Sequence, residues 1–179
     1  MPEDVKDVLY SVINEIGRDK IRMDVTADIK TSEKYFMDIV DKCTSLMGSK
    51  ANDQTLATLC EGLLHFMLTA SLLPSERKVS LRGADLDIVI PSTRTLGKNP
   101  DRSLVIQVVG GDPVTKVKQA ESVQPHRENI WFISAGKLQT DRRNYHLSST
   151  GLPYSRIISD ISAFLAEKGD RGLKLLHGQ

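Results

Sequence analysis

The chain has 179 residues, 40% hydrophobic and 26% charged, a composition ordinary for a globular domain with its own core. Its 24 basic and 23 acidic residues leave a formal net charge of +1, which is not the bulk charge of a protein that coats nucleic acid. No apolar run approaches the roughly 20 residues that span a bilayer, and the acidic start Met1-Pro2-Glu3-Asp4 is unlike a signal peptide. These features predict a cytoplasmic protein that does not associate with membranes.

The beginning of the chain is predicted to form a mainly helical extension. Apolar residues at helical spacing predict helices over residues 3–17 and 32–47. Between them, residues 21–29 alternate apolar and polar side chains, which favours a half-exposed strand, with a short helix as the alternative. Cys43 and Cys60 lie in apolar helical patterns, so we interpret them as reduced core residues rather than as a disulfide or metal ligands.

The next predicted helix carries the first candidate site residue. Asn52 or Asp53 can cap this helix, and the apolar pattern continues to about Leu73, just before a proline. Glu61 lies at the edge of the apolar stripe, four residues before His65, so these two side chains can touch. We therefore expect Glu61 beside the core rather than inside it.

A hairpin and a polar loop follow that helix. Residues 76–81 and 85–91 are predicted to be two antiparallel strands joined by a tight turn at Arg82-Gly83. Glycine fits such a turn because it adopts positive φ without steric cost. Residues 92–102 are polar, and we predict a loop there.

The remaining segments predict a strand–helix–strand unit and a last helix. Residues 103–109 are apolar on both faces apart from one glutamine, which is typical of a central, covered strand. A helix over 114–122 and a buried strand over 129–134 complete a parallel, right-handed unit. We predict a loop over 141–153 and a helix over about 155–169.

Two polar residues stand out within these predicted strands. Asp87 opens the apolar end of the hairpin's second strand, and Gln107 interrupts the central strand. A buried carboxylate and a buried amide cost free energy unless a partner, a metal or a substrate binds them. Glu61 on the preceding helix and Lys116 and Lys118 on the following helix complete a candidate functional site.

This order of elements and residues resembles the restriction-endonuclease-like core of the PD-(D/E)xK nuclease superfamily, over about residues 53–168. The resemblance implies an α/β fold with a central mixed β-sheet flanked by helices. In that superfamily a helix glutamate, an aspartate on the second strand and an acid on the third strand share a magnesium site, since Mg²⁺ prefers oxygen ligands. The metal lowers the pKa of a bound water and neutralises phosphate charge.

Position by position, the resemblance implies that Glu61, Asp87 and Gln107 are the catalytic and metal-binding set for Mg²⁺. Some members accept glutamine at the third-strand position, because its carbonyl can still bind the metal. Val109 departs from the pattern, since it stands where the superfamily has a lysine. The resemblance allows a lysine recruited from a neighbouring element, and Lys116 or Lys118 on the following helix could serve, with Lys118 included in the expected catalytic set.

Basic residues around these strands predict a locally positive rim despite the neutral total, and phosphate contacts would follow from it. The residues are Arg82, Arg94, Lys98, Arg102 and Lys116.

Each candidate site residue also has a structural interpretation that involves no bound metal or substrate. Asp87 could pair with Arg82 or cap a turn, Gln107 could be a core amide bonded to backbone, and Glu61 and the lysines could be solvated.

Three functions stay open at this point. The leading hypothesis is a nucleic-acid-binding protein of nuclease-like fold with an eroded catalytic site. The alternatives are an active Mg²⁺-dependent nuclease with a relocated lysine, and a non-catalytic protein-interaction scaffold in which the N-terminal fifty residues form a dimer interface. The predicted organisation is a helical extension packed on the core at 1–50, the α/β core at 51–169 and a C-terminal tail at 170–179.

Overall fold

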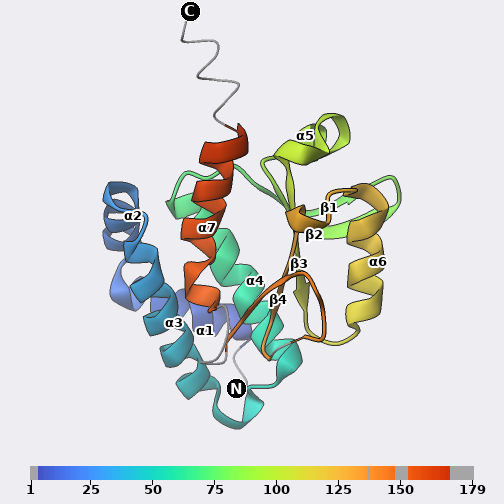
Figure 1. Cartoon of the computed structure of the whole chain (residues 1–179). Coiled ribbons are helices and arrows are strands. Elements are labelled where there is room, and N and C mark those ends of the chain that lie inside the picture. Colours follow the sequence, from blue (N-terminus) through green and yellow to red (C-terminus); the bar gives the residue numbers. More distant parts are fainter. Residues whose placement is uncertain (1–3, 137, 148–152, 170–179) are drawn as a thin grey trace, which may run out of the picture.

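The structure is a computed structural model that describes residues 4–136, 138–147 and 153–169; the predicted tail lies outside these residues. Its centre is a five-stranded sheet in the order β1-β2-β3-β4-β5, with helices on both faces (Figure 1). The first three strands pair antiparallel and the last three pair parallel, so the predicted α/β class with a mixed sheet is confirmed. The strands are β1 (Glu76–Leu81), β2 (Ala84–Ile90), β3 (Leu104–Val109), β4 (Ile130–Ser134) and β5 (Arg143–His146).

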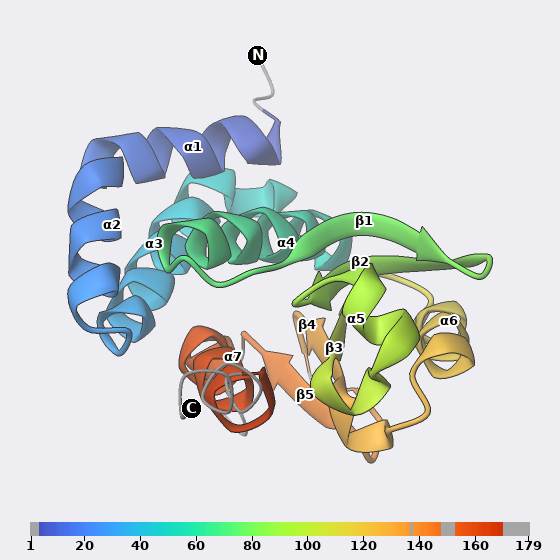
Figure 2. The ribbon, with the colours of Figure 1, turned by 90° about the horizontal axis from the view of Figure 1, so that it is seen from above.

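Two apolar clusters fill the space on either side of the sheet. On one face, α4 and α7 cover the strands, and α1, α2 and α3 pack around α4 (Figure 2). On the other face, α5 and α6 cover β2, β3 and β4. The helices are α1 (Val5–Ile16), α2 (Arg18–Ala27), α3 (Thr31–Met47), α4 (Asp53–Ala70), α5 (Thr93–Lys98), α6 (Pro113–Val123) and α7 (Ile157–Phe164), with a π-helical turn after it at Leu165–Gly169.

The strand predicted over residues 21–29 is wrong, because α2 occupies this segment. Ile21 and Val25 are buried, whereas Met23 between them is 72% exposed. The two buried positions are four residues apart, which is one helical turn, so the apolar alternation was coincidental. The short-helix alternative was the correct one.

Two further segments predicted as loops contain regular structure. Residues 93–98 form α5, which Ser92 caps by accepting a hydrogen bond from the Thr95 N–H, and which buries Leu96 against the sheet. Residues 143–146 form β5, the edge strand parallel to β4. Within the described part of the chain, no helix is long and apolar enough to cross a membrane.

Candidate functional site

The candidate site lies where β2 and β3 separate. Their backbones pair from Ile90 opposite Leu104 to Ile88 opposite Ile106, and the pairing stops there. Beyond this point the β1–β2 hairpin extends away from β3 and reaches past α6 (Figure 2). The strands therefore leave backbone groups beside Asp87 that need other partners.

Side chains supply those partners across the gap. The Gln107 Oε1 atom accepts a hydrogen bond from the Asp87 backbone N–H at 2.8 Å. In return, the Asp87 Oδ2 atom accepts one from the Val108 backbone N–H at 2.8 Å. The two polar residues singled out in the sequence thus face each other and bridge the two separating strands.

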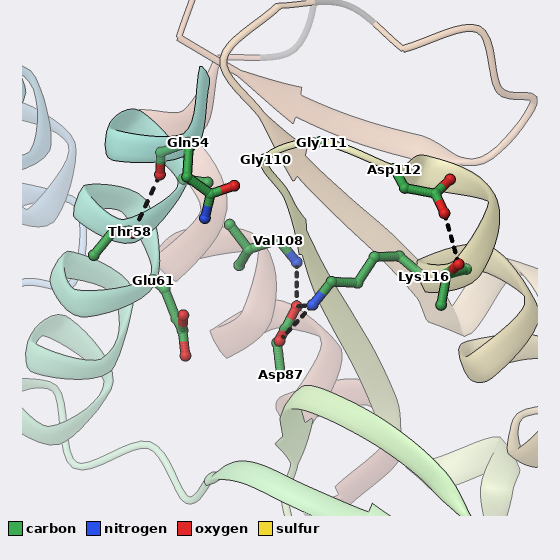
Figure 3. Close-up of a pocket in the computed structure, with 11 residues that line it drawn as sticks. Gln54, Thr58, Glu61, Asp87, Val108, Gly110, Gly111, Asp112 and Lys116 are labelled. Carbon is green, nitrogen blue, oxygen red and sulfur yellow. Dashed lines mark hydrogen bonds and ion pairs between the residues drawn. The ribbon is translucent and has the colours of Figure 1, made fainter. Parts of the chain in front are cut away.

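Lys116 on α6 adds a cation to this bridge. Its Nζ atom donates to Asp87 Oδ1 at 2.8 Å and to Asp87 Oδ2 at 2.7 Å (Figure 3). The side chains of Asp87 and Lys116 are 15% and 32% exposed, so the ion pair is partly shielded from water. Asp112 caps the start of α6. Its carboxylate accepts from the Thr115 hydroxyl at 2.7 Å and from the Val114 N–H at 2.9 Å, and these two bonds lower the pKa of Asp112.

Gln107 is fully buried, and its hydrogen bonds within the described residues all join it to backbone groups. Its Nε2 atom donates to the Lys116 carbonyl at 3.2 Å and to the Asp85 carbonyl at 3.4 Å. Val109 packs in the apolar cluster beneath α6, on the same side of β3. These hydrogen bonds are the ones expected of a core amide bonded to backbone, which was the structural interpretation of Gln107.

Glu61 on α4 faces the same region from the opposite side. The Arg77 Nε atom donates to Glu61 Oε1 at 3.1 Å, and Lys78 Nζ lies 3.9 Å from that oxygen. The Glu61 side chain is 15% exposed. His65, one turn along α4, has its pKa lowered by burial and by the Arg77 charge, while Glu61 opposes this shift.

A pocket of about 390 Å³ separates α4 from α6 at the end of β3, with the Glu61 and Asp87 carboxylates on its walls (Figure 3). Gly110 forms its floor close to α4, because a Cβ atom there would lie 2.8 Å from the Ala57 Cβ. The next glycine, Gly111, has open space around it. The lining residues are Gln54, Ala57, Thr58, Glu61, Asp87, Val108, Gly110, Gly111, Asp112, Thr115 and Lys116.

The structure thus brings Glu61, Asp87 and Lys116 together and leaves the other predicted site residues out of the pocket lining. Gln107 is not among the lining residues, and Lys118 is exposed on α6. The sequence analysis missed Arg77, the partner of Glu61. Hairpin register could have found it, because counting back from the turn places Arg77 opposite Ile88, next to Asp87.

The predicted basic rim falls into separate parts. Lys116 lies in the pocket, whereas Arg82 at the hairpin tip donates to the Gly97 carbonyl of α5 at 3.5 Å. Arg94 and Lys98 are exposed on α5. Arg102 precedes β3, whereas the pocket lies after it, at the other end of a strand that is roughly 20 Å long.

The oxygen atoms around this pocket are not available as ligands for a magnesium ion. Both oxygens of Asp87 already accept from Lys116, and one oxygen of Glu61 accepts from Arg77. The amide of Gln107 is committed to backbone groups. Among the residues that the structure describes, no group of three or more His, Cys, Asp or Glu side chains could hold a metal ion.

Comparison with solved structures finds similarity to the restriction endonuclease Ecl18kI, in a metal-depleted complex with uncleaved DNA. The match has a TM-score of 0.55 and 9% sequence identity, and covers 92% of this chain and 80% of that one. No protein-family model and no curated protein sequence matches this chain. The chain therefore has the restriction-endonuclease-like fold that its resemblance to the PD-(D/E)xK nucleases predicts.

Proposed function

We propose that this protein binds nucleic acid across the face that carries the pocket and leaves the phosphodiester backbone intact. The fold supports the binding half of this proposal, since the similar structure of Ecl18kI is a complex with DNA. Fold similarity alone does not determine activity, so the second half is argued from the pocket.

One observation supports our proposal that the protein does not hydrolyse the phosphodiester backbone. The ammonium group of Lys116 bonds to both oxygens of Asp87, the carboxylate that a nuclease of this fold needs for its metal. The active-nuclease alternative also requires Gln107 as a ligand, and that amide would have to give up three hydrogen bonds to backbone. Buried polar groups left without partners cost about 1–3 kcal/mol each, so this rearrangement is unfavourable.

Exposed cations on β1 and α6 would contact the phosphates. Lys78 lies beside Glu61 and its side chain is 61% exposed. Lys118 is exposed on α6, two residues after Lys116, which is the ion-pair partner of Asp87. With so few contacts, affinity at physiological salt should be on the order of micromolar or weaker and should fall steeply as salt increases.

Fluorescence anisotropy tests the binding, with labelled single- and double-stranded DNA and RNA at about 50 and about 200 mM salt. The variant Lys78→Glu/Lys118→Glu should lose about tenfold or more in affinity and show a shallower salt dependence. The matched control is Arg94→Glu/Lys98→Glu, which makes the same charge change on α5 and should keep most of the affinity. No binding by the unaltered protein at low salt would refute the proposal and favour a protein-interaction scaffold.

Incubation with supercoiled DNA and Mg²⁺ or Mn²⁺ tests the absence of hydrolysis. We expect the DNA to stay intact. Cleavage that Asp87→Asn abolishes, in a variant that remains folded by circular dichroism, would instead establish the active-nuclease alternative.

A further inference from the structure

Groups on β3 and α6 bind both oxygens of the Asp87 carboxylate. The carboxylate accepts two hydrogen bonds from Lys116 Nζ and one from the Val108 backbone N–H. We propose that Lys116 is the built-in cation of this pocket, which takes the position of a metal at Asp87 and fastens α6 to the separated ends of β2 and β3. This inference does not depend on nucleic-acid binding.

Lys116 is held at both of its ends. Its ammonium group bonds to Asp87 on β2, and its backbone carbonyl accepts a hydrogen bond from the Gln107 amide on β3 at 3.2 Å. Asp87 and Gln107 are also bonded to each other's strands. Three elements thus meet at one residue, so the position of the cation is set by the fold and not by a freely rotating surface side chain.

The charged side chains around the pocket leave no excess of negative charge that would attract a divalent cation. The acidic side chains are Glu61, Asp87 and Asp112, which line the pocket. The cations are Lys116 at Asp87, and Arg77 and Lys78 at Glu61. A divalent ion at Asp87 would have to displace the Lys116 ammonium, which would lose both of its hydrogen bonds to this carboxylate while the fold keeps it beside the ion.

The test measures the melting temperature of the protein in EDTA and in millimolar Mn²⁺. The unaltered chain should melt at the same temperature in both. Lys116→Met removes the charge but keeps the length of the side chain, and it should lower the melting temperature in EDTA by about 5 °C. Mn²⁺ should recover part of this loss, because Asp87 is then free to bind it.

Two variants make the assignment specific. Lys116→Met/Asp87→Asn should lose the response to Mn²⁺, and Lys34→Met, the same change on an exposed residue of α3, should melt like the unaltered protein in both buffers. If Mn²⁺ stabilises the unaltered chain and Asp87→Asn removes that effect, Lys116 is not the resident cation. An Lys116→Met variant with no response to Mn²⁺ would also overturn the proposal.

A fallback exists if Lys116→Met does not fold. Lys116→Arg keeps the positive charge, so it should fold and should not be stabilised by Mn²⁺. A gain in melting temperature with Mn²⁺ in this arginine variant would contradict the proposal, whatever the outcome of the nucleic-acid titrations.

Discussion

The substitution Gln107→Glu separates the two roles open to this residue more sharply than any other change. If Gln107 were a metal ligand, glutamate would restore the acid that the superfamily pattern expects and would strengthen the binding of Mg²⁺. If Gln107 is instead the structural bridge seen here, glutamate replaces a hydrogen-bond donor by a charged acceptor inside the core. The structure predicts the second outcome.

The cost follows from three hydrogen bonds. The bond from the Asp87 N–H to Oε1 survives the substitution, whereas the two bonds donated by Nε2 are lost. The new carboxylate oxygen would face the carbonyl oxygens of Lys116 and Asp85, now 3.2 and 3.4 Å from the nitrogen. Two lost bonds and a buried, unpaired charge together cost at least about 3 kcal/mol, which lowers the melting temperature by roughly 6–12 °C in a chain of this size.

Urea denaturation in EDTA, followed by circular dichroism, gives the free energy of unfolding. The matched control is Gln119→Glu, the same chemical change at a partly exposed position of α6, which should stay within about 0.5 kcal/mol of the unaltered protein. A Gln107→Glu variant as stable as the unaltered chain would refute the bridging role. Restoration of its stability by Mg²⁺ would place residue 107 in a metal site.

Three other properties can be checked. Gly110→Ala should destabilise the protein by about 1–3 kcal/mol in urea denaturation, because its Cβ meets α4 at 2.8 Å, whereas Gly111→Ala should have little effect. The lowered pKa of His65 means that the imidazole binds a proton more readily in the unfolded chain than in the folded one. The free energy of unfolding should therefore fall as pH drops below about 6.5. Urea denaturation at several pH values should show a smaller fall for His65→Gln than for the unaltered protein. Burial raises the pKa of Cys43 to about 11 and of Cys60 to about 12, so neither thiol should react with Ellman's reagent at mildly alkaline pH until urea unfolds the chain; rapid labelling of the folded protein would contradict this.

Much of the fold could be predicted because its signals are local. The hairpin follows from an Arg-Gly turn between two apolar patterns, and the structure has Arg82 and Gly83 there with positive φ. The covered strand follows from an apolar run, and every residue of β3 is buried. β5 could not be found in this way, because it is a four-residue edge strand that begins with the polar pair Arg143-Asn144.

The candidate site could be predicted only in part, because its chemistry depends on a non-local feature. The sequence places Asp87 and Gln107 on neighbouring strands, and the structure confirms that they meet. Whether these groups bind a metal or backbone depends on where β2 leaves β3, and on which side chain α6 presents there. Neither property has a signature in the residues next to Asp87 or Gln107.

The two departures from the superfamily pattern on β3 have one physical explanation, which is the close packing of α6. Gln107 must donate to the carbonyl of Lys116, and a carboxylate at this position would repel that oxygen. Val109 packs against the apolar side of α6 together with Ala120, where a lysine would bury its charge. The same packing brings the Lys116 ammonium to Asp87. The glutamine, the valine and the relocated lysine are therefore coupled, and restoring the superfamily residue at 107 or 109 alone should destabilise the chain instead of restoring a nuclease.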